Sequence, residues 1–481
     1  MGNVRVVDAI IIVVYFAVMA VMGIIAYRRN KTSEDFFVAG KSMGTFSLAA
    51  MWLSSWIGGS SIVGTSTDAY NLGVTGGWYV TILAVGCVIF GLTFSKVTKT
   101  LGDKLKNITY PGLIMSRYDR VSSDIVIICC FLANVGFLAS QLVAMGSMLT
   151  TITGWSASTC FIISTVITIA YSAIGGLMAI KYTTWIQFIL IVLGTVVLGI
   201  PLSAKAMGGF SQLQTLPPEW FDIGRRGWPM ILALGVSSVF SFFTSMDSYT
   251  RCIAARDAKT ARTGTIYAAV LVFIIAGAST FLGMAGKLIL PDLSSSNNVI
   301  AALVVELFPH GLKGLALIGV LSAIMSTADI SVLTGSASLT KDIYQRYINP
   351  NVSEKTLLHV GLVAFLLVGV LGAIFGWFTQ DIMNILLITF TINSAGLFLP
   401  TIGAFFWEKS CSAGAFASML SATVIAVVWF IGGKVSTLPL FSIDALWPSF
   451  GVSAILYVVI CLTHRQTPAE QEKAEKFYAA K

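Results

Sequence analysis

The sequence predicts an all-α, polytopic membrane protein with about 13 transmembrane helices. Hydrophobic residues make up 56% of the chain and charged residues only 11%, whereas soluble proteins carry about 25% charged residues. Apolar stretches close to the ~20 residues that cross a bilayer recur along the whole chain. These stretches are continuous and do not alternate with a period of two, which argues against a β-barrel.

The predicted spans follow one another through short connections, and we expect no appended soluble domain. They are 8–27, 44–71, 76–97, 123–152, 158–180, 183–205, 229–254, 262–287, 313–340, 355–377, 382–405, 411–432 and 447–463. The first span is too long for a signal-peptide core and no small-residue cleavage site follows it, so we expect a retained helix. The polar residues 464–481 predict a short helical tail.

Lysine and arginine gather in alternate loops, which predicts the orientation of the chain. The basic loops contain Arg28, Arg29, Lys31, Lys41, Lys96, Lys99, Lys104, Lys106, Arg117, Arg120, Arg251, Arg256, Lys259, Arg262, Lys341, Arg346 and Lys355. The opposite loops contain Arg5, Lys205, Arg225, Arg226, Lys287, Lys313 and Lys434 of the 30 basic residues. Because basic loops stay in the cytoplasm, we expect a cell (inner or plasma) membrane protein with its N-terminus outside and its C-terminus inside.

Two spans contain polar and glycine residues that predict a broken helix. The run SSWIGGSSIVGTSTDAY lies within 44–71, and the run GVSSVFSFFTSMDSYTR lies within 229–254. The two spans are five apart in the helix count. Interrupted spans at equivalent places in two halves are typical of inverted-repeat transporters. The alternative is close helix packing through small residues.

The span 313–340 contains the hydroxyl pair Ser326-Thr327 and the carboxylate of Asp329. A carboxylate at membrane depth costs between ~2.5 and more than 10 kcal/mol and indicates a functional site. Hydroxyls and unwound carbonyls can replace the water shell of a hard cation such as sodium. Alternatively, such hydroxyls bond back to the preceding helical turn or to a neighbouring helix.

Four stretches carry a family resemblance that extends over nearly the whole chain. They are DFFVAGKSMGTFSLAAMWLSSWIGG at 35–59, AIGGLMAIKYTTWIQFILIVLG at 173–194, LSAIMSTADISVLTGSASLTKDIY at 321–344 and GAFFWEKSCSAGAFASM at 403–419. The sequence resembles the sodium:solute symporter family, with local similarity to its choline and proline carrier branches.

The resemblance implies a five-plus-five inverted-repeat (LeuT-like) core within a single transporter domain, 1–481. The extra first helix is then 8–27, the first repeat 44–205, the second repeat 229–405, the additional helices 411–463 and the cytoplasmic tail 464–481. By position, the resemblance also implies a sodium site. Its ligands are the carbonyls of Ser54, Ile57 and Ala323 and the hydroxyls of Ser326 and Thr327.

One position departs from the family pattern. The family commonly reads T-D-x-x-Q after the GGL motif, whereas this chain has Thr184 at the aspartate position. Conversely, Asp329 stands where relatives with two sodium sites often have serine. Our hypothesis is that the charge has moved to the facing helix, where Asp329 serves a second cation or a proton. The alternative is a structural hydrogen bond from Asp329 to a neighbouring helix, and a choline-carrier-like branch also has an S-A-D run here.

The solute is expected at the membrane midplane, between the broken helices. The candidate residues are Trp56, Gly58, Ser61, Phe137, Gln141, Phe242, Ser245 and Asp247. Trp56 offers an aromatic face to a cationic group, or it packs in the core. Asp247 pairs with a solute amine or, as we favour, with Arg251 one turn later. An aromatic cage for a quaternary amine is incomplete at Val85 and Ser245.

Together these observations predict a sodium-coupled secondary active symporter that imports an amino acid, an organic acid or an ammonium-type compound by alternating access. The alternatives are a solute-sensing membrane protein with a transporter fold and a passive uniporter. The chain has no P-loop motif and no catalytic constellation, so we do not expect an enzyme. The expected partners are the solute, Na⁺ and the bilayer, without nucleic acid or an obligate protein partner.

Overall fold

The computed structural model describes residues 6–27, 41–106, 109–172, 176–293, 295–296, 299–379, 381–435 and 438–481. Within these ranges the regular secondary structure is helical, apart from one isolated bridge between Met43 and Ala255. Parts of the sequence-based expectations fall outside the described residues, namely Arg5, Arg28, Arg29, Lys31 and the motif segments 35–40 and 173–175.

The helices follow the predicted order of apolar stretches. The first half contains α1 (Val6–Tyr27), α3 (Thr45–Trp56), α4 (Thr65–Leu72), α5 (Trp78–Thr93), α6 (Ser95–Lys104), α7 (Tyr110–Arg117), α8 (Arg120–Thr153), α9 (Ala157–Ser172), α10 (Gly176–Ile191) and α11 (Ile200–Met207). The second half contains α12 (Trp228–Thr244), α13 (Met246–Ala254), α14 (Ala258–Ile289), α15 (Val299–Leu307), α16 (Leu312–Ala337), α17 (Glu354–Phe378), α18 (Ile382–Ser394), α19 (Phe398–Phe406), α20 (Ser412–Val435), α21 (Leu446–Thr463) and α22 (Pro468–Ala480).

The polytopic membrane character is confirmed. Among the described residues, nine helices are long and apolar enough to cross a membrane, and the bent pair α12–α13 makes a tenth. The shorter helices α1 and α9 are also apolar. The continuous segment Ser60–Thr93 joins the end of the predicted span 44–71 to the predicted span 76–97. In its described residues each predicted span therefore corresponds to helical structure, but the boundary predicted between 180 and 183 is wrong, because it falls inside α10.

Both predicted helix breaks are present. Helix α3 ends at Trp56, Ile57 leaves the helical conformation (φ −100°, ψ 83°), and wider π-helical turns at Ser60–Gly64 lead into α4. Helices α12 and α13 meet at an angle of 45°, because Ser245 between them is extended (φ −75°, ψ 128°). The backbone of each broken helix thus exposes polar groups inside the molecule.

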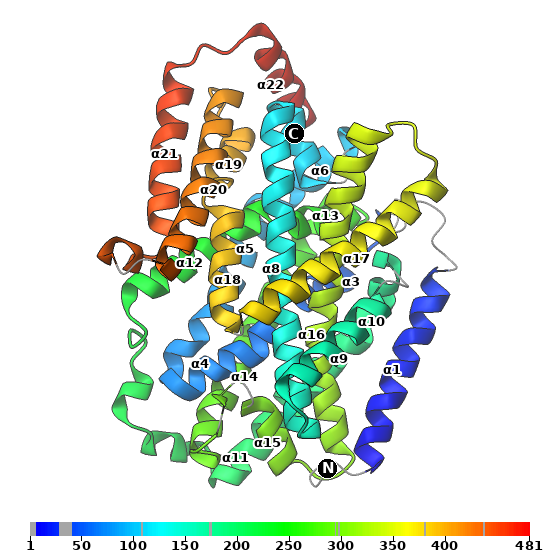
Figure 1. Ribbon diagram of the computed structural model, residues 1–481, viewed down its shortest axis with the longest axis vertical. Helices are drawn as coiled ribbons and strands as arrows, with labels where there is room; N and C mark the ends of the chain where they lie inside the picture. Colours follow the sequence, from blue (N-terminus) through cyan, green and yellow to red (C-terminus); the bar gives the residue numbers. More distant parts are fainter. Residues whose placement is uncertain are drawn as a thin grey trace.

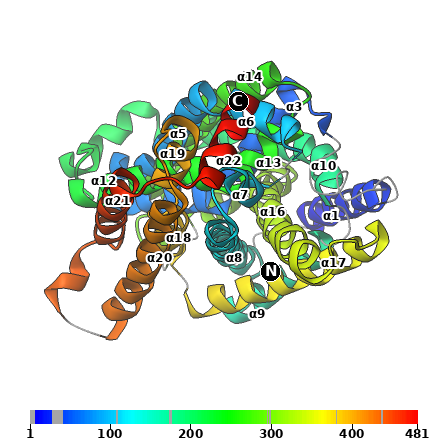
Figure 2. The ribbon, with the colours of Figure 1, turned by 90° about the horizontal axis from the view of Figure 1, so that it is seen from above.

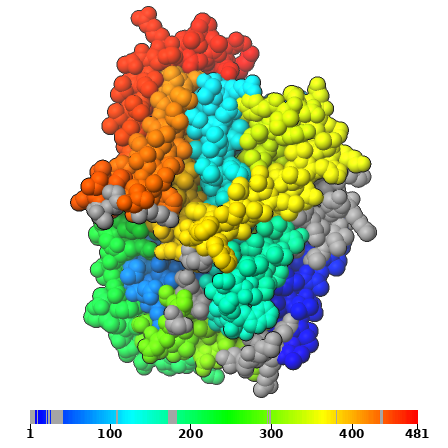
Figure 3. Space-filling model, viewed as in Figure 1, coloured from blue at the N-terminus to red at the C-terminus, as the bar shows by residue number. Residues whose placement is uncertain are grey.

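Helices α8 and α16 lie in the middle of the bundle, and α1 and α21 lie at opposite edges (Figure 1, Figure 2). Every residue of α16 from Ala316 to Ala337 is buried, which is typical of a helix surrounded by others. Helix α16 contacts α3, α8, α10 and α13. Figure 3 shows α17 (yellow) crossing one face of the molecule, with α8 (cyan) between its upper part and the orange and red helices α20 and α21.

Helix α1 is attached to α16 by polar contacts at two heights. The Asp8 carboxylate accepts hydrogen bonds from the backbone N–H groups of Gly311 and Gly314, each at 2.8 Å, at the start of α16. Two turns further into the bundle, the Ser322 hydroxyl donates to the Tyr15 hydroxyl at 3.0 Å. These contacts fix the extra first helix to the central helix.

The C-terminal helix α22 folds back onto α6 and α7 at one end of the bundle (Figure 1). Phe477 is buried against the ring of Phe405, and Lys473 Nζ donates to the carbonyl of Tyr118 at 2.8 Å. Glu470 caps α22 and also accepts the Ser412 N–H at 3.0 Å. The C-terminal tail therefore forms a helix that is docked on the bundle, because Phe477 on its apolar face packs against Phe405.

The docking of α22 should depend on the charge of Glu470. Partial burial raises the pKa of this carboxyl, but hydrogen bonds from the Thr467 and Ser412 N–H groups and from His464 outweigh that effect and lower the pKa to about 2. This stabilisation is present above the unfolded pKa of ~4.3 and is lost as the pH falls towards about 2. We expect Glu470→Gln to increase hydrogen exchange of α22 at neutral pH, with the difference from wild type narrowing in acid.

Glu475 on the same helix provides the control, because its side chain is exposed to solvent. Glu475→Gln should exchange like wild type at every pH. Equal exchange of Glu470→Gln and wild type at neutral pH would show that the capping carboxylate does not hold the tail.

Candidate functional site

The break after α3 is enforced by two glycines that leave no room for a side chain. A Cβ on Gly58 would lie 2.5 Å from Gln141 Oε1 and 2.5 Å from Thr327 Oγ1. A Cβ on Gly59 would lie 2.5 Å from the Cβ of Ala144. Helices α8 and α16 therefore approach the backbone of the break directly, which only glycine permits.

Side chains of other residues satisfy the backbone groups that the break frees. Gln141 of α8 accepts the Gly59 N–H at 2.7 Å through Oε1 and donates through Nε2 to the hydroxyl of Ser60 at 3.3 Å. The hydroxyl of Ser61 donates to the carbonyl of Trp56. Two predicted solute residues, Gln141 and Ser61, are thus engaged in holding the broken backbone.

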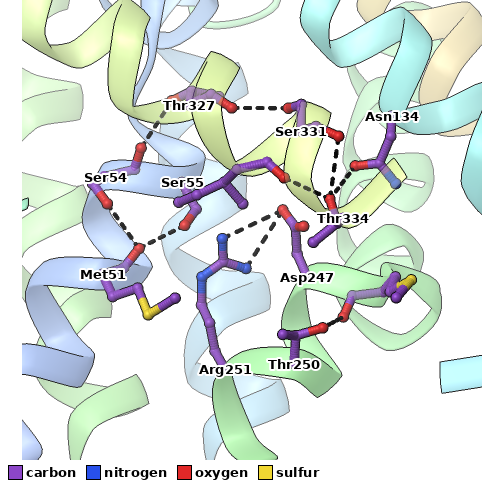
Figure 4. A network of polar contacts seen from close by, with 12 residues as sticks. Met51, Ser54, Ser55, Asn134, Asp247, Thr250, Arg251, Thr327, Ser331 and Thr334 are labelled. Atoms are coloured by element: carbon purple, nitrogen blue, oxygen red, sulfur yellow. Dashed lines mark hydrogen bonds and ion pairs between the residues drawn. The ribbon is translucent and has the colours of Figure 1, made fainter. Parts of the chain in front are cut away.

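Four oxygen atoms of α3 and α16 converge beside the break. Figure 4 shows one of these contacts, between Thr327 and Ser54. The hydroxyls of Ser326 and Thr327 both donate to the carbonyl of Ser54, each at 2.9 Å. Ser326 Oγ also lies 3.0 Å from the carbonyl of Ala323. The Ser54 hydroxyl itself bonds to the Met51 carbonyl at 3.0 Å and so is turned away. The structure therefore brings together four of the five residues expected to bind sodium.

This oxygen cluster fits a sodium ion chemically. All of its members are neutral oxygens in a fully buried place, and hard cations prefer oxygen ligands. Each hydroxyl retains lone pairs that a cation can use once its hydrogen turns away. The fifth expected residue, Ile57, is where the backbone leaves the helix, which redirects its carbonyl from the helical direction.

Asp329 lies on a different face of α16 from Thr327. It is seven residues from Ser322 and therefore shares the face that contacts Tyr15 of α1. Its carboxylate is buried and close enough to Tyr15 for an electrostatic interaction. Asp329 thus faces the junction of α1, α10 and α16, which contact one another.

Polar side chains of α10 lie in the buried part of the same region. Among the residues that the structure describes, the hydroxyl of Thr184 has no hydrogen-bond partner, and the amide of Gln187 lies beside the Tyr15 hydroxyl, with which it interacts. Buried polar groups rarely lack partners, and each such group calls for an explanation such as an ion or water. Thr184 is the position at which the family resemblance leads us to expect an aspartate.

Aromatic rings surround Trp56 at the level of the break. Its ring stacks on Phe242 of α12 at 4.1 Å between centroids, and Phe137 of α8 lies 6.2 Å away. Phe390 of α18 is nearly parallel to Trp56 at 6.4 Å, and Tyr79 of α5 lies 6.1 Å from Phe390. The indole N–H of Trp56 is buried and has no acceptor in the part of the chain that the structure describes. The aromatic cluster therefore contains one hydrogen-bond donor, the Trp56 N–H, surrounded by apolar rings.

Asp247 pairs with Arg251, as the i,i+4 spacing predicts (Figure 4). The closest atoms, Asp247 Oδ2 and Arg251 Nη1, are 3.4 Å apart, and both side chains are buried. The guanidinium also lies 5.4 Å from the centre of the Trp52 ring. A pairing of Asp247 with a solute amine would therefore compete with an existing ion pair.

The remaining solute predictions have mixed outcomes. Ser245 is buried at the bend between α12 and α13. Val85 is 49% exposed and points away from the break, so no substitution there completes an aromatic cage. Sequence reasoning missed Phe390 and Tyr79, which lack any distinctive motif, and it missed Tyr15, which lies in an ordinary apolar span.

Comparisons with known proteins give the same picture. The sequence model of the sodium:solute symporter family matches residues 36–422. The chain is 26% identical to the sodium/pantothenate symporter of Escherichia coli, over 87% of this chain and 89% of that protein. It is 23% identical to the high-affinity proline transporter PutP of Bacillus subtilis, over 86% and 90%, and 25% identical to the high-affinity choline transporter 1 of Caenorhabditis elegans, over 91% and 79%.

Two solved structures show that the fold is shared with transporters. A Na⁺-coupled sialic acid symporter in a substrate-bound outward-open state has a TM-score of 0.78 at 18% identity, with 96% of this chain and 98% of that chain covered. Mhp1, a nucleobase-cation-symport-1 family transporter, has a TM-score of 0.58 at 16% identity, with 93% and 99% covered. The predicted LeuT-like fold class is confirmed.

A side chain at Gly58 should separate the helices of this site. We expect Gly58→Ala to destabilise the protein by about 1–3 kcal/mol, because the new methyl group overlaps Gln141 and Thr327. Thermal denaturation of purified protein measures the effect. Gly277→Ala is the control, since no atom lies within 4 Å of its added Cβ. Equal stability of the two variants would contradict the close approach at the break.

Proposed function

This chain belongs to the sodium:solute symporter family, and we propose that the oxygens of Ser54, Ala323, Ser326 and Thr327 hold its coupling ion. The chain is a multi-pass membrane protein that couples Na⁺ to the movement of a small organic solute. Its transporter fold is consistent with alternating access. The Ile57 carbonyl is the proposed fifth ligand, by its position at the break.

The observation that carries this proposal is the meeting of two adjacent hydroxyls on one carbonyl. Bound Na⁺ supplies a positive charge to which both hydroxyls and the two carbonyls can turn. Ser54 belongs to α3 and the hydroxyls belong to α16, so the ion ties the broken helix to the central one. Trp56 follows Ser54 by two residues, and this links ion binding to the solute region.

The ion supplies energy as well as structure. An inward Na⁺ gains ~2.3 kcal/mol for each 100 mV of membrane potential. A tenfold concentration gradient adds ~1.4 kcal/mol. Coupling to one ion therefore supports solute accumulation, which a passive uniporter or a solute sensor does not perform.

We favour a solute that carries a hydrogen-bond acceptor such as a carboxylate. The Trp56 N–H has no acceptor among the described residues, and Asp247 is paired with Arg251, so the region offers a hydrogen-bond donor more readily than a free carboxylate. The face of Trp56 towards Phe242 is covered by stacking, which removes one surface for a cationic head group. We therefore favour an amino acid or an organic acid as the solute over an ammonium-type compound. Gly58, Phe137 and Ser245 remain proposed lining residues.

We also propose that Asp329 serves a second cation or a proton at the junction of α1, α10 and α16. The Thr184 hydroxyl, which has no partner among the described residues, and the Gln187 amide beside Tyr15 support a polar site opposite a buried carboxylate. The alternative role is a structural hydrogen bond. By the distribution of Lys and Arg, we propose an outside N-terminus and a cytoplasmic C-terminus, and we propose no obligate protein partner.

Removal of the hydroxyl ligands should weaken sodium binding specifically. We expect Ser326→Ala and Thr327→Val to raise the sodium concentration for half-maximal uptake by about tenfold or more, since a bond to a charged group contributes ~1.5–3 kcal/mol. Uptake into proteoliposomes at varied sodium measures this. Ser336→Ala on the same helix is the control, because its hydroxyl bonds to the Leu333 carbonyl of its own helix. An unchanged sodium dependence in both ligand variants would overturn the site.

The relocated charge can be tested by moving it back. Asp329→Asn should reduce the number of cations transported per solute, and Asp329→Ser combined with Thr184→Asp should restore it. The measurement is the reversal potential of solute flux in proteoliposomes. If Asp329→Asn keeps the wild-type sodium dependence and stoichiometry, Asp329 has only a structural role.

A further inference from the structure

An apolar groove lies on the surface of the bundle, between the first half of a broken helix and two neighbours. Its volume is about 430 Å³. Its walls come from α3, α10 and α14, and they include Phe46, Ala50, Trp185, Phe188, Tyr267 and Val270. None of the residues that line it is charged. The groove is separate from the sodium and solute residues described above.

The groove opens towards the surroundings of the bundle. Phe46 is 68% exposed, Tyr267 is 49% exposed and Val270 is 58% exposed. Contacts hold its walls in place, since the rings of Phe46 and Tyr267 are 5.8 Å apart and the Trp185 N–H donates to the Ser47 hydroxyl at 3.3 Å. Because α14 is a membrane-length helix, hydrocarbon chains of the bilayer have access to this surface.

Positive charge lies at the end of the groove where α14 begins. Arg256 and Lys259 are both exposed, and Arg256 Nε donates to the Thr260 hydroxyl at 3.2 Å. Thr260 and Tyr267 are seven residues apart and share one face of α14. Asp257 Oδ2 lies 3.3 Å from Arg256 Nε, but both side chains are exposed, so this ion pair is weak. Because Asp257 offsets the charge of Arg256, Lys259 provides the net positive charge at this end of the groove.

The distance along α14 fits one leaflet of a membrane. From Lys259 to Leu271 the helix rises by ~18 Å at ~1.5 Å per residue. Half of the hydrocarbon core is ~15 Å thick. A lipid whose phosphate meets Arg256 and Lys259 can therefore extend an acyl chain along the whole groove.

We infer that this groove is a binding site for an anionic phospholipid. The acyl chain lies between α3, α10 and α14, and the phosphate group contacts Arg256 and Lys259. Charge complementarity selects the occupant, because a zwitterionic lipid brings no net charge to these two basic side chains.

A second apolar groove on the same protein lacks nearby basic residues and serves as a comparison for the first groove. It lies between α9 and α17, has a volume of about 310 Å³ and includes Phe161, Val166 and Trp377 in its lining. No Lys or Arg occurs in the sequence within eleven residues of any lining position, which is the separation of Arg256 from Tyr267, whereas Asp381 does. This groove accommodates acyl chains without selecting the head group, so it provides an internal reference.

The position of the lipid also gives it a consequence for transport. Phe46 and Ala50 belong to the same half-helix as Ser54, so a lipid in the groove contacts the helix that carries part of the proposed sodium site. This consequence rests on the proposed function, whereas lipid binding itself does not. A failure of either can therefore be recognised separately.

Native mass spectrometry of detergent-purified protein tests the site, with phosphatidylglycerol and phosphatidylcholine of identical acyl chains as probes. We expect wild type to bind phosphatidylglycerol about tenfold more tightly or better. Arg256→Gln with Lys259→Gln should reduce its affinity to that of phosphatidylcholine. Val270→Trp should weaken binding of both lipids, because the indole fills the groove.

Two matched variants serve as controls. Lys355→Gln removes an exposed basic residue at the start of α17, and Val166→Trp fills the reference groove at a position that is 60% exposed. Both should keep the wild-type preference. The inference is overturned if wild type binds the two lipids equally, if the preference survives loss of Arg256 and Lys259, or if Val166→Trp has the same effect as Val270→Trp.

Discussion

The structure depends on one constraint, the need to satisfy backbone polar groups inside a membrane. The break after Trp56 removes helical partners from α3, and other residues replace them. Gln141 of α8 accepts the Gly59 N–H, while Ser326 and Thr327 of α16 donate to the Ser54 carbonyl. An unsatisfied buried group costs about 1–3 kcal/mol. The interruption of one helix therefore fixes how three helices meet.

The same constraint distinguishes the part of the break that can bind an ion. Hydroxyls have one hydrogen and two acceptor lone pairs, so Ser326 and Thr327 retain lone pairs for a cation while their hydrogens are used in hydrogen bonds. The Gly59 N–H has no such lone pair and stays bonded to Gln141. One side of the break is thus a fixed support, and the other side can accept a cation.

The sequence indicated residues whose chemistry is local, and it failed where partners come from distant segments. The density of glycine and serine predicts the break, and the Ser326-Thr327 pair predicts the oxygen cluster, because both depend on neighbours in the chain. The outward direction of Val85 and the closeness of Phe390 to Trp56 depend on how α5 and α18 pack. Asp329 and Ser322 share a face by spacing, but nothing in the first span indicates that Tyr15 covers it.

This last contact explains why the extra first helix matters to the site. A carboxylate facing lipid costs between ~2.5 and more than 10 kcal/mol. Tyr15 and Asp8 hold α1 against α16, so the face that carries Ser322 and Asp329 meets protein. Helix α16 also supplies three of the four converging oxygens, whereas Ser54 belongs to α3. Helices α1 and α16 therefore act as one unit, and an ion among these oxygens joins that unit to the broken helix.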